Sequence, residues 1–140
     1  MFMNTVTLHQ SFSSDLMRIL TVVETQFAAR SIRENLENLE YEADAMVFSA
    51  PDAFAHLKKE SFDLILLDAE WLKPGISALD FIENIRGSDS FNEIPVLICS
   101  AKSTTEDIKQ ALRAGASGYL LKPYSEETFK EHIEKFLVSA

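Results

Sequence analysis

Four side chains that can do chemistry each follow a run of apolar residues in this 140-residue chain. They are two carboxylates, a hydroxyl and an ammonium: Glu24, Asp68, Ser100 and Lys122. The clearest case is Asp68, which closes the run LILL. A continuous apolar run of this length is typical of a strand buried in a parallel sheet. Ligands bind at the carboxyl ends of such strands, so Asp68 is the first candidate for a functional residue.

The chemistry of this set depends on whether the four strand ends lie side by side. Neighbouring strands are about 4.8 Å apart, so adjacent ends would bring these side chains into one site. Two carboxylates favour Mg²⁺, which prefers oxygen ligands, and a lysine with a hydroxyl can hold phosphate oxygens. An aspartate in that setting can attack phosphorus and form an acyl phosphate. Taken singly, each residue is more often a solvated surface group, so the hypothesis depends on all four converging.

The elements that must position these residues follow from the hydrophobic pattern. Apolar runs predict five strands, and apolar residues at helical spacing predict a helix after each strand. In the first helix, Phe27, Ile32, Leu36 and Leu39 are expected near one buried face. A hydroxyl residue that can cap the helix begins each of the other four: Ser49, Ser77, Thr104 and Ser125. The predicted strands cover residues 17–23, 43–48, 62–68, 94–100 and 117–121, and the predicted helices cover 26–39, 49–59, 77–86, 104–114 and 125–136.

Five strands alternating with five helices predict the fold class. This is an α/β fold of three layers, in which helices cover both faces of a five-stranded parallel sheet. Residues 1–16 are polar and rich in Ser and Thr, so we expect a flexible extension followed by one domain over residues 17–140. The link after Asp68 is long and rich in turn residues, which is where function is commonly found. It contains Trp71, either an anchor for a partner or a lid over the base of the loop.

The net charge of −9 limits the partners that we expect. Nucleic acid and anionic membranes attract clustered Lys and Arg, so both are disfavoured and a cationic protein patch is favoured. No Lys or Arg precedes Arg18, and no apolar segment approaches the roughly 20 residues of a membrane span. We therefore expect no signal peptide, no membrane partner and a cytoplasmic location. The single cysteine, Cys99, lies in an apolar run and is expected to be a small buried residue.

Four stretches of the chain, with the strand and helix order around them, resemble the receiver domain of two-component response regulators. They are RILTV at 18–22, DLILLD at 63–68, IPV at 94–96 with SA at 100–101, and AGASGYLLKPY at 114–124. The resemblance covers residues 17–137, and its last stretch is the most specific. It implies the CheY-like, flavodoxin-like fold, whose strand order 2-1-3-4-5 would bring the four candidate residues together.

The resemblance implies a phosphoryl site at these strand ends. Asp68 would accept a phosphoryl group from a histidine kinase or a phosphotransfer protein, and Ser100 and Lys122 would bind that group. Tyr119 matches the aromatic residue that changes rotamer on activation, and the peptide bond between Lys122 and Pro123 would be cis. Beyond self-phosphorylation from small donors and autodephosphorylation, the resemblance implies no enzymatic activity.

The resemblance also implies a magnesium site, and the chain departs from the family there. Mg²⁺ would be held by Glu24, Asp68 and the backbone carbonyl of Glu70. The family normally ends its first strand in two acidic residues, whereas this chain has Val23 and Glu24. Because Val23 carries no oxygen, we expect weak Mg²⁺ binding. The Glu70 side chain either restores the missing charge, pairs with Lys102, or stays in solvent.

Three functions are compatible with these observations. The leading one is a stand-alone receiver that signals by protein contact through the surface from Thr104 to Phe136. The second is a degenerate receiver, an interaction scaffold without phosphorylation, and Val23 supports it. The third is a small phosphatase with Asp68 as nucleophile, as in the haloacid dehalogenase family, although that family has an aspartate where Glu70 stands. Labelling by a small phosphodonor, with Asp68→Asn as control, separates the three.

Overall fold

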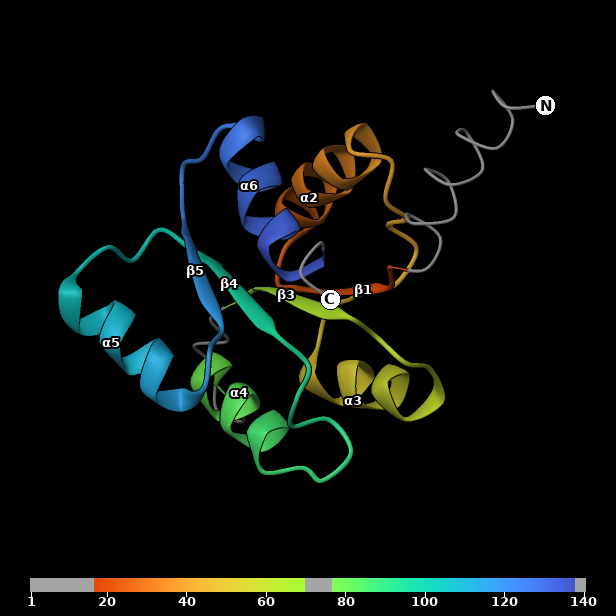
Figure 1. Ribbon diagram of the computed structural model, residues 1–140, viewed down its shortest axis with the longest axis vertical. Coiled ribbons are helices and arrows are strands. Elements are labelled where there is room, and N and C mark those ends of the chain that lie inside the picture. Colours follow the sequence, from red (N-terminus) through yellow and green to blue (C-terminus); the bar gives the residue numbers. More distant parts are fainter. Residues whose placement is uncertain (1–16, 70–76, 138–140) are drawn as a thin grey trace.

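The computed structural model describes residues 17–69 and 77–137, in which five strands alternate with five helices (Figure 1). The expectations for residues 1–16, Glu70 and Trp71 lie outside these residues. The strands are β1 (Ile19–Val23), β2 (Met46–Val47), β3 (Leu64–Asp68), β4 (Val96–Ser100) and β5 (Gly118–Leu121). The helices are α2 (Gln26–Asn38), α3 (Ala50–Lys59), α4 (Ala78–Arg86), α5 (Thr105–Ala114) and α6 (Glu126–Leu137).

All five strands are parallel and lie in the order β2-β1-β3-β4-β5. This confirms the predicted fold class and the strand order that the resemblance implied. The pairing of β1 with β3 ends with Val23 opposite Asp68, and that of β4 with β5 ends with Ser100 opposite Leu121. The carboxyl ends of β1, β3, β4 and β5 therefore meet at one edge of the sheet, which we call the carboxyl edge.

Helices α2 and α6 cover one face of the sheet, and α3, α4 and α5 cover the other (Figure 1). Alternation along β1 divides its side chains between the two faces, so that Val23 packs toward α2 and α6 while Val22 packs toward the other helices. Phe129 of α6 and Phe81 of α4 are fully buried, one in each face. None of the helices in the described residues is long and apolar enough to span a membrane.

Hydroxyl side chains cap the four helices for which the sequence predicted a cap. The side chains of Ser49, Ser77 and Thr104 accept hydrogen bonds from the backbone N–H three residues further on, at 3.2, 3.1 and 3.0 Å. Ser125 accepts from the N–H of Thr128 at 3.1 Å, at the start of α6. Each cap satisfies an N–H group that the first turn of a helix leaves without a partner.

One arginine ties together the segments at the amino ends of β4 and β5. Arg86, the last residue of α4, donates to the carbonyl oxygens of Gly115 at 2.8 Å and of Ile94 at 2.7 Å. It also donates to the carbonyl of Asn92 at 3.2 Å and to the hydroxyl of Ser117 at 3.1 Å. Burial of the guanidinium lowers the pKa of Arg86. Two features favour glycine at position 115. Its φ of 116° is one that other residues rarely adopt, and a Cβ there would collide with the side chain of Arg86.

A second arginine closes the amino ends of β1 and β3. The backbone N–H of Arg18 donates to the side chain of Asp63, and the N–H of Asp63 donates to the carbonyl of Arg18. The guanidinium of Arg18 pairs with three carboxylates, those of Glu42, Asp44 and Glu60, at 3.2, 3.1 and 2.8 Å. Burial opposes the charge of this guanidinium, but Asp44 and Glu60 outweigh burial and raise the pKa of Arg18.

The structure corrects the predicted burial of Phe27. This side chain, expected on the buried face of the first helix, is 83% exposed. The buried residues of α2 are Ala28, Ala29, Ile32 and Leu36. Phe27 precedes Ile32 by five residues, a spacing that places two side chains well apart around a helix. The expectation was therefore wrong because Phe27 belongs to a different side of α2.

The structure also shortens several predicted strands. The strands β1, β3 and β4 each begin two residues later than predicted, and β2 contains only Met46 and Val47 rather than residues 43–48. Residues before the strands still bond to neighbours, as Ile65 N–H does to the carbonyl of Pro95, but they lie outside the regular ladder. β2 is an edge strand whose preceding residues, Glu42 and Asp44, are exposed and pair with Arg18.

Candidate functional site

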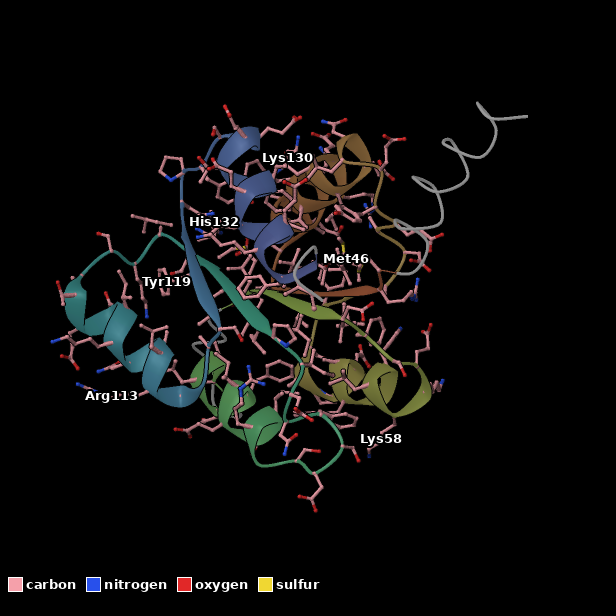
Figure 2. The ribbon with its side chains drawn as sticks, in the orientation of Figure 1. Met46, Lys58, Arg113, Tyr119, Lys130 and His132 are labelled. Atoms are coloured by element: carbon pink, nitrogen blue, oxygen red, sulfur yellow. The ribbon has the colours of Figure 1, made fainter. Side chains whose placement is uncertain are left out.

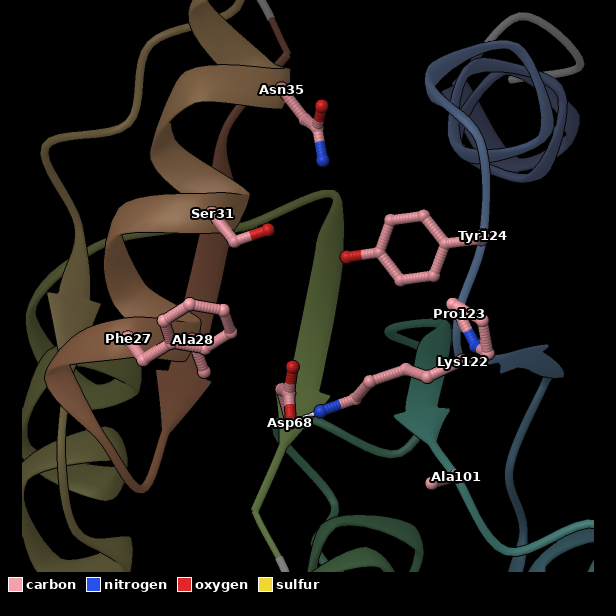
Figure 3. A pocket seen from close by; sticks show the side chains of 9 residues that line it. All are labelled: Phe27, Ala28, Ser31, Asn35, Asp68, Ala101, Lys122, Pro123 and Tyr124. Carbon is pink, nitrogen blue, oxygen red and sulfur yellow. Dashed lines mark hydrogen bonds and ion pairs between the residues drawn. The ribbon is translucent and has the colours of Figure 1, made fainter.

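The site is centred on Asp68, the last residue of β3, whose side chain is 10% exposed. The ammonium of Lys122, which directly follows β5, donates to Oδ1 of Asp68 at 2.7 Å. Figure 3 shows the lysine stem running across the carboxyl edge of the sheet toward the carboxylate. The Lys122–Pro123 peptide bond is cis, as the resemblance implied. Two of the candidate residues, from strands on either side of β4, are therefore in direct contact.

The β1 side of the site presents a hydrocarbon beside that ion pair. Val23 is opposite Asp68 in the β1–β3 ladder and is fully buried. Glu24 follows it and is exposed. Within residues 17–69 and 77–137, no group of three or more His, Cys, Asp and Glu side chains could hold a metal ion. The proposed metal ligands in the described residues are thus two carboxylates, those of Glu24 and Asp68.

Ser100 and Tyr119 are joined through the backbone of Lys102, in the loop after β4. Ser100 is 8% exposed, and its hydroxyl oxygen accepts a hydrogen bond from the N–H of Lys102 at 3.0 Å. The hydroxyl of Tyr119 donates to the carbonyl of Lys102 at 2.7 Å. Figure 2 shows Tyr119 on the side of β5 that faces α5. The last residue of β4 and a residue of β5 thus hold the same loop residue from two directions.

A cavity of about 510 Å³ opens directly beside Asp68 and Lys122. Its walls come from α2 on one side and from the segment between β5 and α6 on the other (Figure 3). A cavity of this size accommodates a small molecule or the reacting end of a larger one. The lining combines apolar with polar side chains: Phe27, Ala28, Ala101, Pro123 and Tyr124 with Ser31, Asn35, Asp68 and Lys122.

Tyr124 lies on the wall of this cavity opposite α2. Its ring stacks on that of Phe129 with a centroid distance of 5.6 Å, and Figure 3 shows its hydroxyl directed toward the side of the cavity where Ser31 lies. Burial, together with smaller effects of nearby acidic groups, raises the pKa of the Tyr124 phenol. The phenol therefore keeps its proton at neutral pH.

The cavity was not predicted from the sequence. The lining residues that were missed are Phe27, Ser31, Asn35 and Tyr124. A partial signal was present, because Ser31 and Asn35 are four residues apart and so lie on one face of a helix that was predicted correctly. Tyr124, which lines the same cavity from the opposite wall, is about ninety residues away in the chain. Local patterns do not identify a contact over such a separation.

Cys99, the residue before Ser100, is buried as predicted. Burial, and to a smaller extent the carboxylate of Asp68, raises the pKa of its thiol far above the ordinary value. Because the thiolate is the reactive form of cysteine, we assign no chemistry to this residue.

A doubly wound parallel sheet with an aspartate–lysine pair at its carboxyl edge defines a CheY-like α/β protein. The chain belongs to the response regulator receiver family, because residues 19–134 match the profile of the response regulator receiver domain. The chemotaxis protein CheY-3 of Vibrio cholerae is 32% identical over 119 residues, which cover 85% of this chain and 90% of that protein. The chemotaxis protein CheY of Pseudomonas aeruginosa is 30% identical over 119 residues, which cover 85% and 94%.

Solved structures share the fold at lower sequence identity. The chemotaxis protein CheY4 of Vibrio cholerae superposes with a TM-score of 0.73 at 21% identity, covering 86% of this chain and 98% of that one. The receiver domain of a sensor histidine kinase from Pseudomonas aeruginosa superposes with a TM-score of 0.72 at 20% identity, covering 87% and 98%. That second structure holds a magnesium ion in its active-site cleft. At identities this low, the two superpositions show a shared fold and nothing more specific.

Proposed function

We propose that Asp68 accepts a phosphoryl group from a histidine kinase or a phosphotransfer protein, so that the chain acts as a receiver in two-component signalling. The observation that carries the proposal is the 2.7 Å ion pair between Lys122 and Asp68 at the carboxyl edge. The ammonium offsets the charge of the carboxylate and so lowers the repulsion that an incoming phosphoryl group meets. The similarity to chemotaxis response regulators supports the same role.

In the proposed transfer, an oxygen of Asp68 attacks phosphorus and the bond between phosphorus and the donor nitrogen breaks. The donor imidazole leaves with that electron pair, and Asp68 becomes an acyl phosphate. Lys122 then pairs with an oxygen of the phosphoryl group, and the hydroxyl of Ser100 donates to another. Before transfer this hydroxyl oxygen accepts a bond from the backbone N–H of Lys102, and it would exchange that bond for donation of its own proton when it turns to the phosphoryl group.

Magnesium is the cofactor that receiver domains typically bind at this position. The oxygen donors that we propose in this chain, Glu24, Asp68 and the backbone carbonyl of Glu70, are of the kind that Mg²⁺ prefers. When bound, the ion offsets the charge of the phosphoryl oxygens. Val23 is fully buried and adds no oxygen to this set. We therefore infer that the first acidic position of the family is degenerate here and that Mg²⁺ binds weakly.

The proposed output surface is formed by α5, β5 and α6. Leu112 of α5 and Leu121 of β5 are 49% and 42% exposed, although both are apolar. Large exposed apolar side chains on two elements that are in contact, such as α5 and β5, favour binding to another protein. We therefore propose a downstream protein partner for this surface, and no partner among nucleic acids or membranes.

Phosphorylation would act on this surface through the loop after β4. If the hydroxyl of Ser100 turns to the phosphoryl group, the N–H of Lys102 is free to reorient. The carbonyl of Lys102 is the acceptor for Tyr119, so the position of Tyr119 depends on the same loop residue. A local change of charge at Asp68 thereby biases the conformation of an aromatic side chain on β5.

Incubation with Mg²⁺ and a small phosphodonor tests the proposal. Stable labelling that Asp68→Asn abolishes supports the phosphoacceptor role. Lack of labelling at every donor concentration favours the second candidate, a scaffold that works without phosphorylation, for which the buried Val23 is the supporting observation. Release of inorganic phosphate without accumulation of phosphoprotein indicates a phosphatase instead.

A further inference from the structure

We propose that the ring of Phe27 packs against the leaving group of the phosphodonor, a contact that we call the aromatic seat. The site would then prefer donors whose leaving group is a planar ring. The inference rests on the proposed phosphoryl transfer to Asp68 and adds donor selectivity to it. It starts from an unusual combination, because Phe27 is 83% exposed and yet lines the cavity beside Asp68. The free energy of the system falls when another apolar group covers a large apolar ring that is exposed to water.

The position of Phe27 relative to the reacting atoms supports this role. Figure 3 shows its ring on the α2 side of Asp68 and the ammonium of Lys122 on the opposite side. A phosphorus atom attacked by Asp68 lies next to that carboxylate, so the leaving group opposite it occupies the cavity. On the α2 side of the cavity the leaving group meets the apolar side chains of Phe27 and Ala28.

The two walls of the cavity are held in place before any donor binds. The ring of Tyr124, in the segment after β5, stacks on Phe129 of α6 at a centroid distance of 5.6 Å, and Figure 3 shows its hydroxyl directed toward the side of the cavity where Ser31 of α2 lies. Further along α2, the side-chain amide of Asn38 donates to Glu126 at the start of α6, at 3.1 Å. A cavity that is already formed costs little conformational entropy when a flat ring enters it.

The chemistry of the proposed donor supplies such a ring. A phosphohistidine carries its phosphoryl group on imidazole, and N-phosphoimidazole reproduces that bond in a small molecule. When the second ring nitrogen of this donor is protonated, attack by Asp68 breaks the phosphorus–nitrogen bond and returns its electron pair to nitrogen. Imidazole then departs as a neutral molecule, and no further reactant is needed. Phosphoramidate undergoes the same cleavage but releases ammonia, which has no ring to contact Phe27.

The test is the ratio of two initial rates at which the full chain is labelled on Asp68. One rate is measured with N-phosphoimidazole and the other with phosphoramidate, both below saturation, so that general effects of a substitution on the site cancel. Phe27→Ala is expected to lower the ratio roughly fivefold, within the range of one aromatic contact. Phe27→Tyr keeps the ring and is expected to retain the ratio of the natural sequence.

The chain offers a matched control in Phe48→Ala. Phe48 is also exposed, at 40%, but it does not line the cavity, so its removal is expected to leave the ratio unchanged. Labelling by both donors with an unaltered ratio in Phe27→Ala would overturn the aromatic seat and leave the role of Asp68 intact. An equal fall in Phe48→Ala would overturn the seat as well. No labelling by either donor would overturn the phosphoacceptor role, and the seat with it.

Discussion

The two edges of the parallel sheet both hold basic side chains, but the contacts differ in kind. At the edge where the amino ends of the strands meet, which we call the amino edge, Arg86 donates four hydrogen bonds to two segments of the chain, and Arg18 pairs with three carboxylates. At the carboxyl edge, Lys122 reaches Asp68 from a side chain that is 36% exposed. A planar guanidinium fixes several acceptors at once, whereas a lysine ammonium on a flexible stem can exchange one partner for another.

This difference indicates which contacts stabilise the fold and which serve the proposed function. The arginines join segments that are distant in sequence and hold the strands in register, whereas the lysine serves a carboxylate that we propose to change its chemical state. In open α/β folds, ligands bind at the carboxyl edge, so the opposite edge is available for fixed contacts. Substitutions at the two edges should accordingly affect different measurements.

The largest effect is expected from Asp68→Asn at the carboxyl edge. The amide lacks the nucleophilic carboxylate, so labelling by any small phosphodonor should be lost altogether while the fold is retained. Mass spectrometry of the intact chain measures the first result, and circular dichroism measures the second. Labelling of the variant at the same rate as the natural sequence would show that the phosphoacceptor is a residue other than Asp68.

At the amino edge, Arg86→Ala is expected to lower the free energy of unfolding by about 2–3 kcal/mol, because two partly buried carbonyl groups, those of Gly115 and Ile94, lose a charged donor. The measurement is urea unfolding followed by circular dichroism. Labelling of Asp68 should persist wherever the variant is folded. If stability were unaltered and labelling were lost, the proposed division between the edges would be wrong.

The matched control for this substitution is Arg113→Ala. Arg113 is an exposed residue in the last turn of α5 and pairs with Glu106 of the same helix at 3.5 Å (Figure 2). Exposed ion pairs of this kind contribute at most about 1 kcal/mol. A loss as large as that of Arg86→Ala would show that stability at this edge does not depend on the buried guanidinium.

A smaller effect is expected from Val23→Asp, which adds a carboxylate to the carboxyl edge. If the missing oxygen limits metal binding, the variant should bind Mg²⁺ about tenfold more tightly, which corresponds to roughly 1.4 kcal/mol. Titration calorimetry measures both affinities. Val23→Asn is the control, because it has a similar size and no charge. Equal Mg²⁺ affinity in the natural sequence and in Val23→Asp would rule out the inferred deficit.

The smallest effect concerns the turn that follows α2. Glu40 has a φ of 66°, a left-handed conformation that glycine adopts without the clash of a Cβ. Glu40→Gly should therefore raise the free energy of unfolding by about 0.5–1 kcal/mol and leave Asp68 labelling unchanged. Glu37→Gly, inside the helix, should lower it by a similar amount. Urea unfolding checks the opposite signs, and a loss of stability in both variants would contradict the assignment of strain to Glu40.

Much of the fold could be predicted from the sequence because its signals are local. The run LILLD identifies β3, and Ser77 lies at the start of a helix where its hydroxyl caps the first turn. The burial of Phe27 was predicted wrongly because its spacing of five residues from Ile32 places it on another side of the helix. The length of β2 was overestimated because only Met46 and Val47 pair with β1, and the preceding Glu42 and Asp44 are exposed and pair with Arg18.

The candidate site could be predicted only in part for a related reason. The strand ends bring Asp68, Ser100 and Lys122 to one edge through the topology, which alternation of elements and the family resemblance both imply. The contact of Arg86 with Gly115, and the cavity that Tyr124 shares with Ser31 and Asn35, bring together residues more than 20 positions apart. Such contacts leave no periodic pattern in the sequence.

Lys102 is held at both of its backbone polar groups, by Ser100 at the N–H and by Tyr119 at the carbonyl. An amide proton that is engaged in this way exchanges slowly with deuterium from the solvent. If the serine hydroxyl turns toward a phosphoryl group, the proton loses its acceptor and exchanges faster. Deuterium uptake at one backbone position would then report the fraction of molecules that are phosphorylated, without a dye or a radioactive label.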